Sequence, residues 1–341
     1  MIPVKRVLIV KTSSLGDLIH TLPAVSDAAH ALQGVEFHWL VEEALREVPA
    51  WHPAVSRVIP IALRRWRRNW WRAWRTRELA GFRQSMLREP YDLVIDGQGL
   101  LKSALPARFA GAPVSGYDHR SIREPLATFF YHQRYRVERQ LHAIERLRRL
   151  FSLALGYALP DTPPEYGLEA GKAGRNRELI FLHGTTWPSK HWPEKYWIEL
   201  ARLALEQGYQ VRWPWHAEEE RRRAERFAQA GGGELLPRMG LTALRGRLTE
   251  AAGAVGVDTG LAHVAAAVGV PAVTLYGPTG AGLTGAIGPA QKNLVADYPC
   301  APCLRRRCDR PDDLDLYPPC YALLSPEVVW QALAAQMDAQ P

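Results

Sequence analysis

The 341-residue chain is 47% hydrophobic and 23% charged, which is more apolar material than one small core holds and predicts two globular domains. Apolar runs such as residues 7–10 are far shorter than the ~20 residues of a membrane-spanning helix, and we expect no secretory leader, so the protein should be cytoplasmic and contact a membrane only from outside the bilayer. The net charge is +8, but residues 1–160 hold 24 Lys and Arg against 14 Asp and Glu while the rest holds 19 against 21, so the N-terminal half should meet an anionic partner.

Short apolar runs alternate with helical periodicity in the first half of the chain. Strands are predicted at residues 6–10, 36–42, 55–61 and 91–99, and a helix over 18–32 that Pro23 should bend. Strands that alternate with helices imply a parallel sheet covered on both faces. The segment near 156–178 is rich in Pro, Gly and charge and lacks periodicity, which is typical of an interdomain linker.

The same alternation restarts after the linker. Strands are predicted at residues 178–184, 209–215, 253–260 and 271–280, with helices at 193–208, 218–230 and 261–270. The prediction is an α/β fold with two doubly wound, Rossmann-like domains over residues 1–160 and 175–325. Such sheets bind ligands beyond the carboxyl ends of their strands, so the functional residues should follow strands and face a cleft between the domains.

The sharpest motif is DTGLAH, residues 258–263, at a strand-to-helix junction. Free backbone N–H groups and the helix dipole at Thr259 and Gly260 would suit a pyrophosphate, and Asp258 could orient a sugar hydroxyl. The alternative interpretation is that Asp258 or Thr259 only caps the helix.

A second loop at a strand end, residues 183–193, supports the first. Its Thr185 and Thr186 can donate to phosphate oxygens, and Lys190 can place a point charge on a leaving diphosphate. A single loop lysine is usually just solvated, but two loops with matching chemistry at strand ends favour a phosphate site.

At the N-terminus, KTSSLGD provides a turn with Gly16 and places Asp17 at the start of the first helix. Acidic residues favour the first helical turn for electrostatic reasons alone. A carboxylate that projects toward a ligand could also take a proton from an acceptor hydroxyl. Lys11, at the end of the strand, could pair with Asp17 or bind acidic groups of the acceptor.

Residues 64–77 hold seven arginines and four of the twelve tryptophans. At ~100° per residue the tryptophans gather on one side and the arginines opposite, so a helix here would be amphipathic. The tryptophan side would either be buried on the domain or touch a bilayer directly. In both cases the arginines project, and forked guanidinium groups bind carboxylates and phosphates well.

Two other ligands, nucleic acid and a nicotinamide cofactor, have partial support in the sequence. Interleaved Arg and Trp could bind nucleic acid, but no recognised nucleic-acid module is present and the second half is slightly acidic, so we expect no nucleic-acid partner. One G-x-G-x-x-G, residues 280–285, could indicate a nicotinamide cofactor. Because Pro278 precedes it and Gly288-Pro289 interrupts any following helix, we interpret it as a flexible loop.

All four cysteines lie near the C-terminal end, at Cys300, Cys303, Cys308 and Cys320. Four thiolates would satisfy a tetrahedral zinc ion in a cytoplasmic protein. The spacing C-x2-C-x4-C-x11-C is not that of a standard zinc ribbon. A zinc site, reduced thiols and a redox pair therefore stay open.

Six stretches in order across both domains carry a family pattern: VLIVKTSSLGDLIHTLPA, VIPIALRRWRR, VIDGQGLLKSA, REPLATFFY, FLHGTT with KHWP, and VDTGLAHVAAA with LYGPTG. Together they resemble the heptosyltransferase I group of glycosyltransferase family 9, over residues from about 5 to 290. The cysteine cluster is not part of that pattern. The resemblance implies a GT-B fold, and transfer of L-glycero-D-manno-heptose from ADP-heptose, with inversion, to the inner Kdo of Kdo2-lipid A at the cytoplasmic face of the bacterial inner membrane.

The resemblance also implies residue roles. Asp17 matches the general base, and Lys190 matches the residue that neutralises the departing diphosphate. The implied donor-binding residues are Thr185, Thr186, Lys190, Glu220, Met239, Asp258, Thr259, Gly260 and His263. Glu220 falls at the ribose and Met239 at the adenine, with Glu218 or Glu219 as alternatives to Glu220. The expected acceptor-binding residues are Lys11, Arg64, Arg65, Arg67, Arg68, Lys102 and Arg123.

We expect no cofactor in the catalysis. An inverting displacement needs one base and stabilisation of the leaving group, and not two carboxylates flanking the bond. The D-x-D at residues 313–315 lies in a Pro-rich tail, so lysine and helix N-termini should take the place of a metal.

Partners, a terminal helix and alternative functions are also expected. The partners should be ADP-heptose, Kdo2-lipid A and the anionic inner-membrane surface. By analogy with GT-B enzymes, a terminal helix over residues 326–341 would return to the first domain. The alternatives are a family 9 enzyme that adds the second heptose or another sugar, and a noncatalytic binder of anionic glycolipid or nucleotide.

Overall fold

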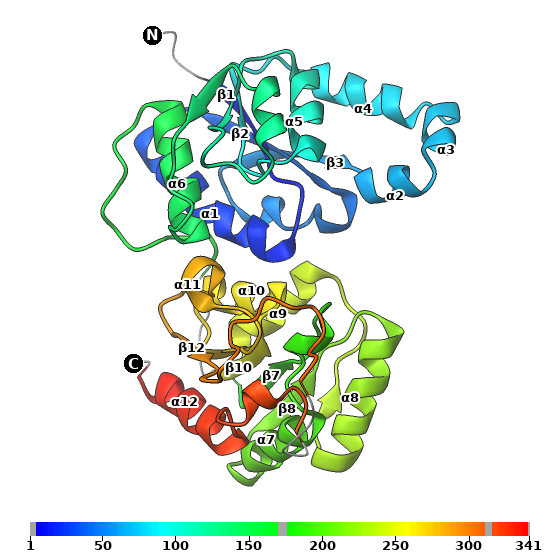
Figure 1. The fold of residues 1–341 in the computed structure, drawn as a ribbon, viewed down its shortest axis with the longest axis vertical. Helices are drawn as coiled ribbons and strands as arrows, with labels where there is room; N and C mark the ends of the chain where they lie inside the picture. The colour runs from blue at the N-terminus through cyan, green and yellow to red at the C-terminus, as the bar shows by residue number, and fades with distance from the viewer. Residues whose placement is uncertain (1–4, 170–175, 311–315, 340–341) are drawn as a thin grey trace. The chain divides into compact units, whose positions relative to one another are not determined.

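A computed structural model describes residues 5–169, 176–310 and 316–339 of the chain. Its contacts divide the chain into two compact units, residues 1–168 and 169–341. The division falls inside the predicted linker near residues 156–178. The D-x-D at residues 313–315 lies outside the described residues. Each unit has its own parallel sheet covered by helices (Figure 1).

Unit 1 is built on six strands, all paired in parallel, in the order β3-β2-β1-β4-β5-β6. The strands are β1 (Arg6–Val10), β2 (Glu36–Glu42), β3 (Val55–Ile61), β4 (Leu93–Asp96), β5 (Val114–Tyr117) and β6 (Gln133–Tyr135). The helices are α1 (Leu15–Ala31), α2 (Leu63–Arg68), α3 (Trp70–Arg75), α4 (Glu78–Leu87), α5 (Leu101–Ala107) and α6 (Ala143–Leu155). The chain adds strands on one side of β1 and then on the other, so the topological switch point lies between β1 and β4.

The centre of this sheet explains the apolar runs of the sequence. Residues 7–10 of β1 are fully buried, as expected for strands covered by helices on both faces. Helix α1 packs against α6, and a buried ion pair joins them, with Arg148 Nε 2.6 Å from Asp27 Oδ2. Pro23 lies inside α1 without ending it. The predicted Rossmann-like character of the first domain is confirmed.

The amphipathic helix predicted over residues 64–77 is broken. Asn69, with φ −152° and ψ 68°, separates α2 from α3, and its side chain accepts the capping hydrogen bond of α3. Trp66 of α2 turns toward α4, where its indole N–H donates to Glu78 at 2.8 Å and its ring meets Phe82 edge to face. The break interrupts the helical rotation, so the later tryptophans do not follow Trp66 into the domain.

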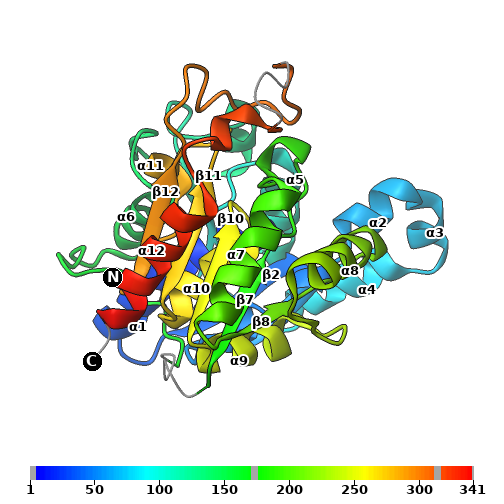
Figure 2. The same ribbon diagram turned by 90° about the horizontal axis from the view of Figure 1, so that it is seen from below.

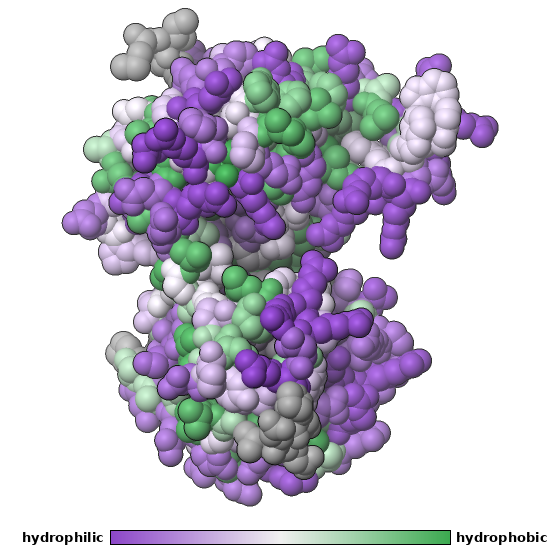
Figure 3. Space-filling view, viewed as in Figure 1, coloured by the Kyte–Doolittle hydropathy of each residue, from purple (hydrophilic) through white to green (hydrophobic). Residues whose placement is uncertain are grey.

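Trp70, Trp71 and Trp74 are exposed on α3, at 56%, 58% and 63%. The first two rings stack with centroids 4.2 Å apart, and Trp71 meets Trp74 edge to face at 6.1 Å. Burial of the tryptophan side, one of the two interpretations weighed above, is therefore wrong for these three. The α2–α3 end of unit 1 is a pale surface bordered by strongly hydrophilic residues (Figure 3). Among the described residues, no helix has the length and apolar character to cross a bilayer.

Unit 2 repeats the architecture with six parallel strands in the order β12-β11-β10-β7-β8-β9. The strands are β7 (Glu178–Leu182), β8 (Gln210–Trp213), β9 (Glu234–Leu235), β10 (Gly253–Val257), β11 (Ala272–Tyr276) and β12 (Gln291–Val295). The helices are α7 (Glu194–Glu206), α8 (Glu218–Gly231), α9 (Leu241–Glu250), α10 (Gly260–Val268), α11 (Ala281–Thr284) and α12 (Pro326–Asp338). The switch point lies between β7 and β10. Helix α11 occupies the G-x-G-x-x-G, where the sequence predicted only a loop.

The core of unit 2 is rich in aromatic rings. Trp213 packs against Phe181 and Trp197, with ring centroids 5.2 and 6.1 Å away. Helix α12 lies beside α7 over the strands and buries Val329 and Leu333 in the same core (Figure 2). By these contacts the terminal helix is part of unit 2, and its return to the first domain stays a prediction.

Buried His52 predicts a pH-dependent stability for unit 1. Its Nδ1 accepts the N–H of Ala54 at 3.2 Å, and its Nε2 lies 2.9 Å from Ser26 Oγ, so the ring is neutral with Nε2 as donor. Burial lowers the pKa of His52 to about 4. Below pH ~6.5 the unfolded chain binds a proton that the folded chain does not, so this histidine costs about 1.4 kcal/mol of stability per pH unit as the pH falls toward 4.

The free energy of unfolding, from denaturant titrations at about pH 7 and about pH 5, checks this expectation. His52→Gln should lose less stability between the two pH values than the parent. The matched control is His119→Gln, because His119 is exposed in the same unit, and it should keep the parent's slope. Equal slopes for all three proteins would contradict the prediction.

Candidate functional site

Lys190, Asp258 and Thr279 meet beyond the carboxyl ends of β7, β10 and β11, which are neighbours in the sheet of unit 2. Lys190 Nζ lies 2.5 Å from Asp258 Oδ2, and Thr279 Oγ1 donates to the same oxygen at 2.7 Å. The side chains of Lys190 and Asp258 are 15% and 11% exposed. This cluster lies at the switch point of the sheet, where doubly wound domains bind ligands.

The loop after β7 fixes the position of Lys190. The residue ends a short turn, Pro188–Lys190, and its carbonyl accepts a hydrogen bond from the Tyr321 hydroxyl at 3.0 Å. Its ammonium lies 4.8 Å from the ring centroid of Trp187, and Arg306 approaches the same ring at 5.5 Å. Two cations therefore contact the Trp187 ring.

Asp258, Thr259 and Gly260 join β10 to α10. Thr259 is the N-cap residue of α10, yet its side chain makes no capping hydrogen bond, and Asp258 is engaged in the cluster described above. Capping alone therefore does not account for this segment. Gly260 begins the helix, where the first N–H groups have no partner within a helix. His263 is buried one turn later, with Nε2 3.9 Å from Asp258 Oδ1.

Glu220 lies against the loop that follows β7. One of its oxygens accepts two backbone N–H groups at the start of α8, at 2.9 and 3.2 Å. The other would lie 2.8 Å from a Cβ placed on Gly184, directly before Thr185. Glu218 and Glu219 instead pair with arginines of α8 itself. Of the three glutamates considered for this position, Glu220 is the one that the structure places beside the loop after β7.

All the predicted donor residues share one location in unit 2. Thr185, half-buried, Thr186, exposed, and Lys190 follow β7. Glu220 follows β8, the half-buried Met239 follows β9, and residues 258–263 follow β10. Because these strands are parallel neighbours, the residues line the same carboxyl edge of the sheet.

Lys11 and Asp17 flank the switch point of unit 1 in a similar way. Buried Lys11 follows β1, and its Nζ donates to the carbonyl of Gly97, after β4, at 2.9 Å. The same nitrogen lies 3.8 Å from Asp17 Oδ1. Burial lowers the pKa of Lys11, while the carboxylates of Asp17 and Asp96 oppose that change. Of the two roles expected for Lys11, the structure shows the pairing with Asp17.

Asp17 both caps α1 and remains accessible. Its Oδ2 accepts the N–H of Ser14 at 2.6 Å and the Ser14 hydroxyl at 2.9 Å, while the side chain is 42% exposed. Lys102 Nζ donates to Ser13 Oγ at 3.1 Å, which brings a second ammonium to this loop. The capping role and a chemical role are therefore compatible in one carboxylate.

The predicted acceptor arginines are of two kinds. Arg65 bonds to both oxygens of Glu43, at 3.1 and 3.2 Å, and to Glu78 at 2.6 Å, so it ties α2 to neighbouring segments. The other members, Arg64, Arg67 and Arg68 on α2 and Arg123 after β5, are exposed, and so is Arg65, whose side chain is 51% exposed despite its ion pairs. The structure thus places Arg123 on a different segment from the α2 arginines.

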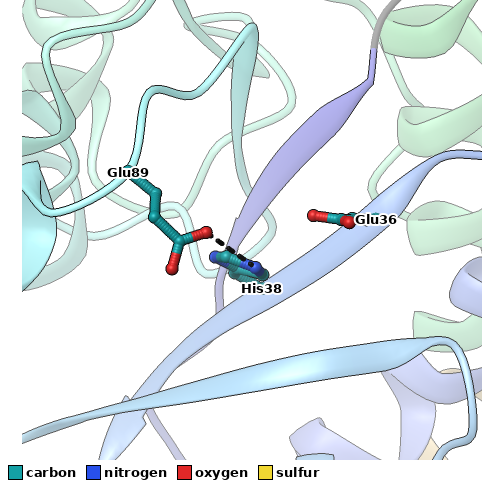
Figure 4. Close-up of side chains that lie close together, drawn as sticks. All are labelled: Glu36, His38 and Glu89. Atoms are coloured by element: carbon teal, nitrogen blue, oxygen red, sulfur yellow. Dashed lines mark ion pairs between the residues drawn. The ribbon is translucent and has the colours of Figure 1, made fainter.

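In the described part of the chain, one group of three possible metal ligands has its ligand atoms within 4.8 Å of one another. It consists of Glu36, His38 and Glu89 (Figure 4). Arg6 lies 2.8 Å from Glu36 and 3.4 Å from Glu89, and Arg57 lies 3.1 Å from Glu89. Two guanidinium groups therefore already neutralise both carboxylates. Arg6 and Glu36 are also the first residues of β1 and β2, so they lie at the amino ends of the strands, whereas the switch-point residues follow the carboxyl ends. We interpret this group as an ion-pair network that stabilises the sheet.

Three site residues were missed from the sequence. Thr279 follows a predicted strand in LYGPTG, so its position after that strand was an available signal. Trp187 lies in the same loop as Lys190, three residues before it. Arg306 reaches the Trp187 ring through folding of the 300–310 segment onto this loop, which no local pattern reveals.

Several known proteins are similar to this chain over most of its length. The sequence pattern of glycosyltransferase family 9 (heptosyltransferase) matches residues 79–312. The lipopolysaccharide heptosyltransferase 1 of Pseudomonas aeruginosa is 49% identical, over 98% of this chain and 97% of that protein. Two structures of the E. coli heptosyltransferase WaaC, with ADP and with ADP-2-deoxy-2-fluoro heptose, match with TM-scores of 0.81 and 0.79 at 44% and 43% identity, each over 86% of this chain and 93% of that chain. The predicted GT-B fold class is confirmed, and the chain belongs to glycosyltransferase family 9, the heptosyltransferases.

Proposed function

We propose that this heptosyltransferase moves L-glycero-D-manno-heptose from ADP-heptose to the inner Kdo of Kdo2-lipid A, with inversion, in lipopolysaccharide inner-core synthesis. The observation that carries the proposal is the Lys190–Asp258–Thr279 cluster at the switch point of unit 2. It occurs in a chain 49% identical to a lipopolysaccharide heptosyltransferase 1. The ligands of the two WaaC structures support a nucleoside diphosphate heptose as donor.

In the proposed reaction the diphosphate lies between Lys190 and the first turn of α10. Negative charge on the diphosphate grows as the bond to the sugar breaks, so Lys190 and the free N–H groups of α10 stabilise the transition state more than the bound donor. Thr279 orients Asp258, which would accept a heptose hydroxyl. The remaining donor contacts in this proposal are Thr185, Thr186, Thr259 and Gly260 for phosphate, Glu220 for ribose, Met239 for adenine and His263 for heptose.

Asp17 is the proposed general base. As the Kdo hydroxyl oxygen attacks the anomeric carbon, Asp17 accepts the hydroxyl proton, and ADP leaves with the electrons of the broken carbon–oxygen bond. Ser14 holds Oδ2 through two hydrogen bonds, which leaves Oδ1, 3.8 Å from Lys11 Nζ, as the basic atom. We assign Lys11 to the positioning of Asp17.

The anionic acceptor would be held by exposed cations of unit 1. Arg64, Arg67 and Arg68 offer guanidinium forks for Kdo carboxylates and lipid A phosphates, with Lys102 and Arg123 as further contacts. Arg65, which is engaged by Glu43 and Glu78, keeps α2 in place. We propose that no metal or other cofactor takes part in the transfer, because Lys190 and the α10 terminus supply the charge that a metal would supply.

We also propose that the enzyme works on the cytoplasmic face of the inner membrane and docks there through α3. Tryptophan rings favour the membrane–water interface, and arginines near an anionic surface contribute about 1 kcal/mol each. Trp70, Trp71 and Trp74 are more than half exposed and lie among Arg72 and Arg75 of the same helix.

Replacing Trp70, Trp71 and Trp74 together with Ala should lower the binding of the protein to anionic phospholipid vesicles by about 10- to 100-fold. Cosedimentation with the vesicles measures this. Stability should change little, because the three rings bury less than half of their surface. Phe129→Ala is the matched control, since this aromatic of unit 1 is 78% exposed and lies outside α2 and α3. Undiminished binding of the triple variant would contradict docking through α3.

The transfer itself is tested by ADP release from ADP-heptose with and without Kdo2-lipid A. Release that requires Kdo2-lipid A supports the proposal. Release that requires an acceptor already carrying the first heptose would instead indicate a second-heptose transferase. Binding of ADP-heptose without release on any acceptor would indicate a noncatalytic binder, and either of these last results overturns the proposed reaction.

A further inference from the structure

The four cysteines, whose role the sequence left open, gather around one small cavity in unit 2. Cys300, Cys303, Cys308 and Cys320 all line it, together with Gly277 and Ser189. All four thiols are free, and Cys320 is buried while the other three are half-buried. Folding has therefore collected every sulfhydryl group of the chain in one place.

The segment that carries three of these cysteines has little apolar packing. Residues 296–310 contain no helix or strand, and none of residues 300–310 is buried. Long irregular segments in compact domains usually have a functional reason. Without buried apolar side chains, residues 300–310 depend on polar contacts with the domain, and a bound ion would add to these contacts.

The charge around the cavity suits a metal–thiolate group. Four thiolates and one divalent cation carry a net charge of about −2. The run Arg305, Arg306 and Arg307, followed by Arg310, supplies compensating positive charge within the same segment, and Asp309 pairs with Arg305. Without a bound anion or an anionic cluster, these arginines would repel one another.

We propose that Cys300, Cys303, Cys308 and Cys320 bind one structural Zn²⁺ ion. Four sulfur ligands favour a tetrahedral d¹⁰ ion, and a reducing compartment keeps thiols available for it. Among the described residues, no three cysteine sulfurs lie within 4.8 Å of one another, whereas tetrahedral Zn–S bonds of about 2.3 Å require closer sulfurs. Binding would therefore draw residues 300–308 inward onto Cys320.

The segment is hydrogen-bonded to the proposed donor site, so the ion would also position that site. Ser189 Oγ donates to the carbonyl of Arg305 at 2.6 Å, and the Ser189 N–H donates to Arg306 at 3.2 Å. The Leu304 N–H donates to Pro278, next to Thr279, at 2.8 Å. The zinc-bound segment would thus hold Ser189, directly before Lys190, and Pro278, directly before Thr279. This second step rests on the proposed function, whereas the metal site does not.

The metal content of the purified chain, measured by plasma emission, tests the site directly. The parent should contain about one Zn²⁺ per chain, and Cys303→Ser and Cys308→Ser should each lower zinc occupancy by at least about tenfold after dialysis against a weak chelator. Asp297→Ser is the matched control, because it alters an exposed residue of the same segment, lies outside the arginine run and keeps all four thiols. It should retain the parent's zinc.

A second measurement uses the parent alone, in case the cysteine variants fold poorly. Cobalt added to chelator-treated protein should produce thiolate-to-cobalt charge-transfer absorption, which reports on these four sulfurs because the chain has no other cysteine. Parent protein that binds neither zinc nor cobalt under reducing conditions would overturn the site. Iron in place of zinc would overturn the assignment of the ion.

The positioning step has its own readout. Zinc removal should raise the KM for ADP-heptose by about tenfold with a smaller change in kcat, and added zinc should restore it. An unchanged KM in zinc-free protein would overturn the positioning role. If the protein does not transfer heptose at all, the zinc content is unaffected, so failure of the proposed function is distinguishable from failure of the metal site.

Discussion

Asp17→Asn is expected to lower kcat by about 10²- to 10⁴-fold while the dissociation constant of ADP-heptose stays within about twofold of the parent. Asparagine keeps an oxygen that can accept the Ser14 N–H, so α1 keeps its cap, but its amide cannot take the proton of the acceptor hydroxyl. The proposed donor contacts belong to unit 2, so donor binding should not change. Steady-state ADP release and calorimetric titration of ADP-heptose measure the two quantities.

Asp92→Asn is the matched control for this substitution. Asp92 is also a carboxylate of unit 1 that accepts two backbone N–H groups, those of Lys5 and Arg6, both at 2.8 Å. It precedes β4 and therefore lies at the sheet edge opposite to Asp17. The control should lose stability but keep its kcat. A kcat for Asp17→Asn within about tenfold of the parent would remove Asp17 from the role of general base.

The central part of both sheets was predictable because it is encoded locally. Runs such as residues 7–10 and 179–182 are continuous and apolar, as a strand between two helix layers requires. The short strand β5 and the outer strands β6, β9 and β12 do not appear among the predicted strands, whereas the outer strand β3 does. Residues 291–295 read QKNLV and are mostly half-buried or exposed, since an edge strand has fewer neighbours and carries a weaker apolar signal.

The break in the Arg/Trp segment shows where periodicity misleads. A pattern of 100° per residue runs through Asn69 without interruption, but Asn69 caps a new helix and Trp66 finds partners on α4. Which partner a tryptophan finds is a tertiary property, so the sequence could indicate an amphipathic segment but not which rings would be buried.

The sequence indicated which residues form the candidate site, but not which of them contact one another. Strand ends indicated where Lys190 and Asp258 lie, because parallel strands place their carboxyl ends at one edge. Their ion pair joins residues far apart in the sequence, and it appears only when β7 and β10 are neighbours. Likewise, only the closeness of Glu220 to Gly184 in the folded chain distinguishes Glu220 from Glu218 and Glu219 as the candidate.

Lys190→Met is expected to lower kcat by about 10²- to 10³-fold and to weaken ADP binding, because the leaving diphosphate loses its main positive charge. The same change leaves Asp258 as a mostly buried carboxylate without its cation, which should cost on the order of 3 kcal/mol of stability. Activity and stability should therefore fall together. Lys292→Met, at an exposed lysine of β12 in the same unit, should affect neither.

A double variant separates the two effects. In Lys190→Met with Asp258→Asn the buried charge is gone, and the asparagine can still accept the Thr279 hydroxyl, which donates to Asp258 at 2.7 Å. Denaturant titration should therefore show the double variant to be more stable than Lys190→Met alone, because the uncompensated carboxylate caused most of the loss. Its kcat should nevertheless stay at least about 10²-fold below the parent, since the Lys190 ammonium no longer faces the diphosphate. If kcat recovers together with stability, the role of Lys190 is to stabilise Asp258 in the folded protein. The leaving group would then be stabilised by the N-terminus of α10 and not by Lys190.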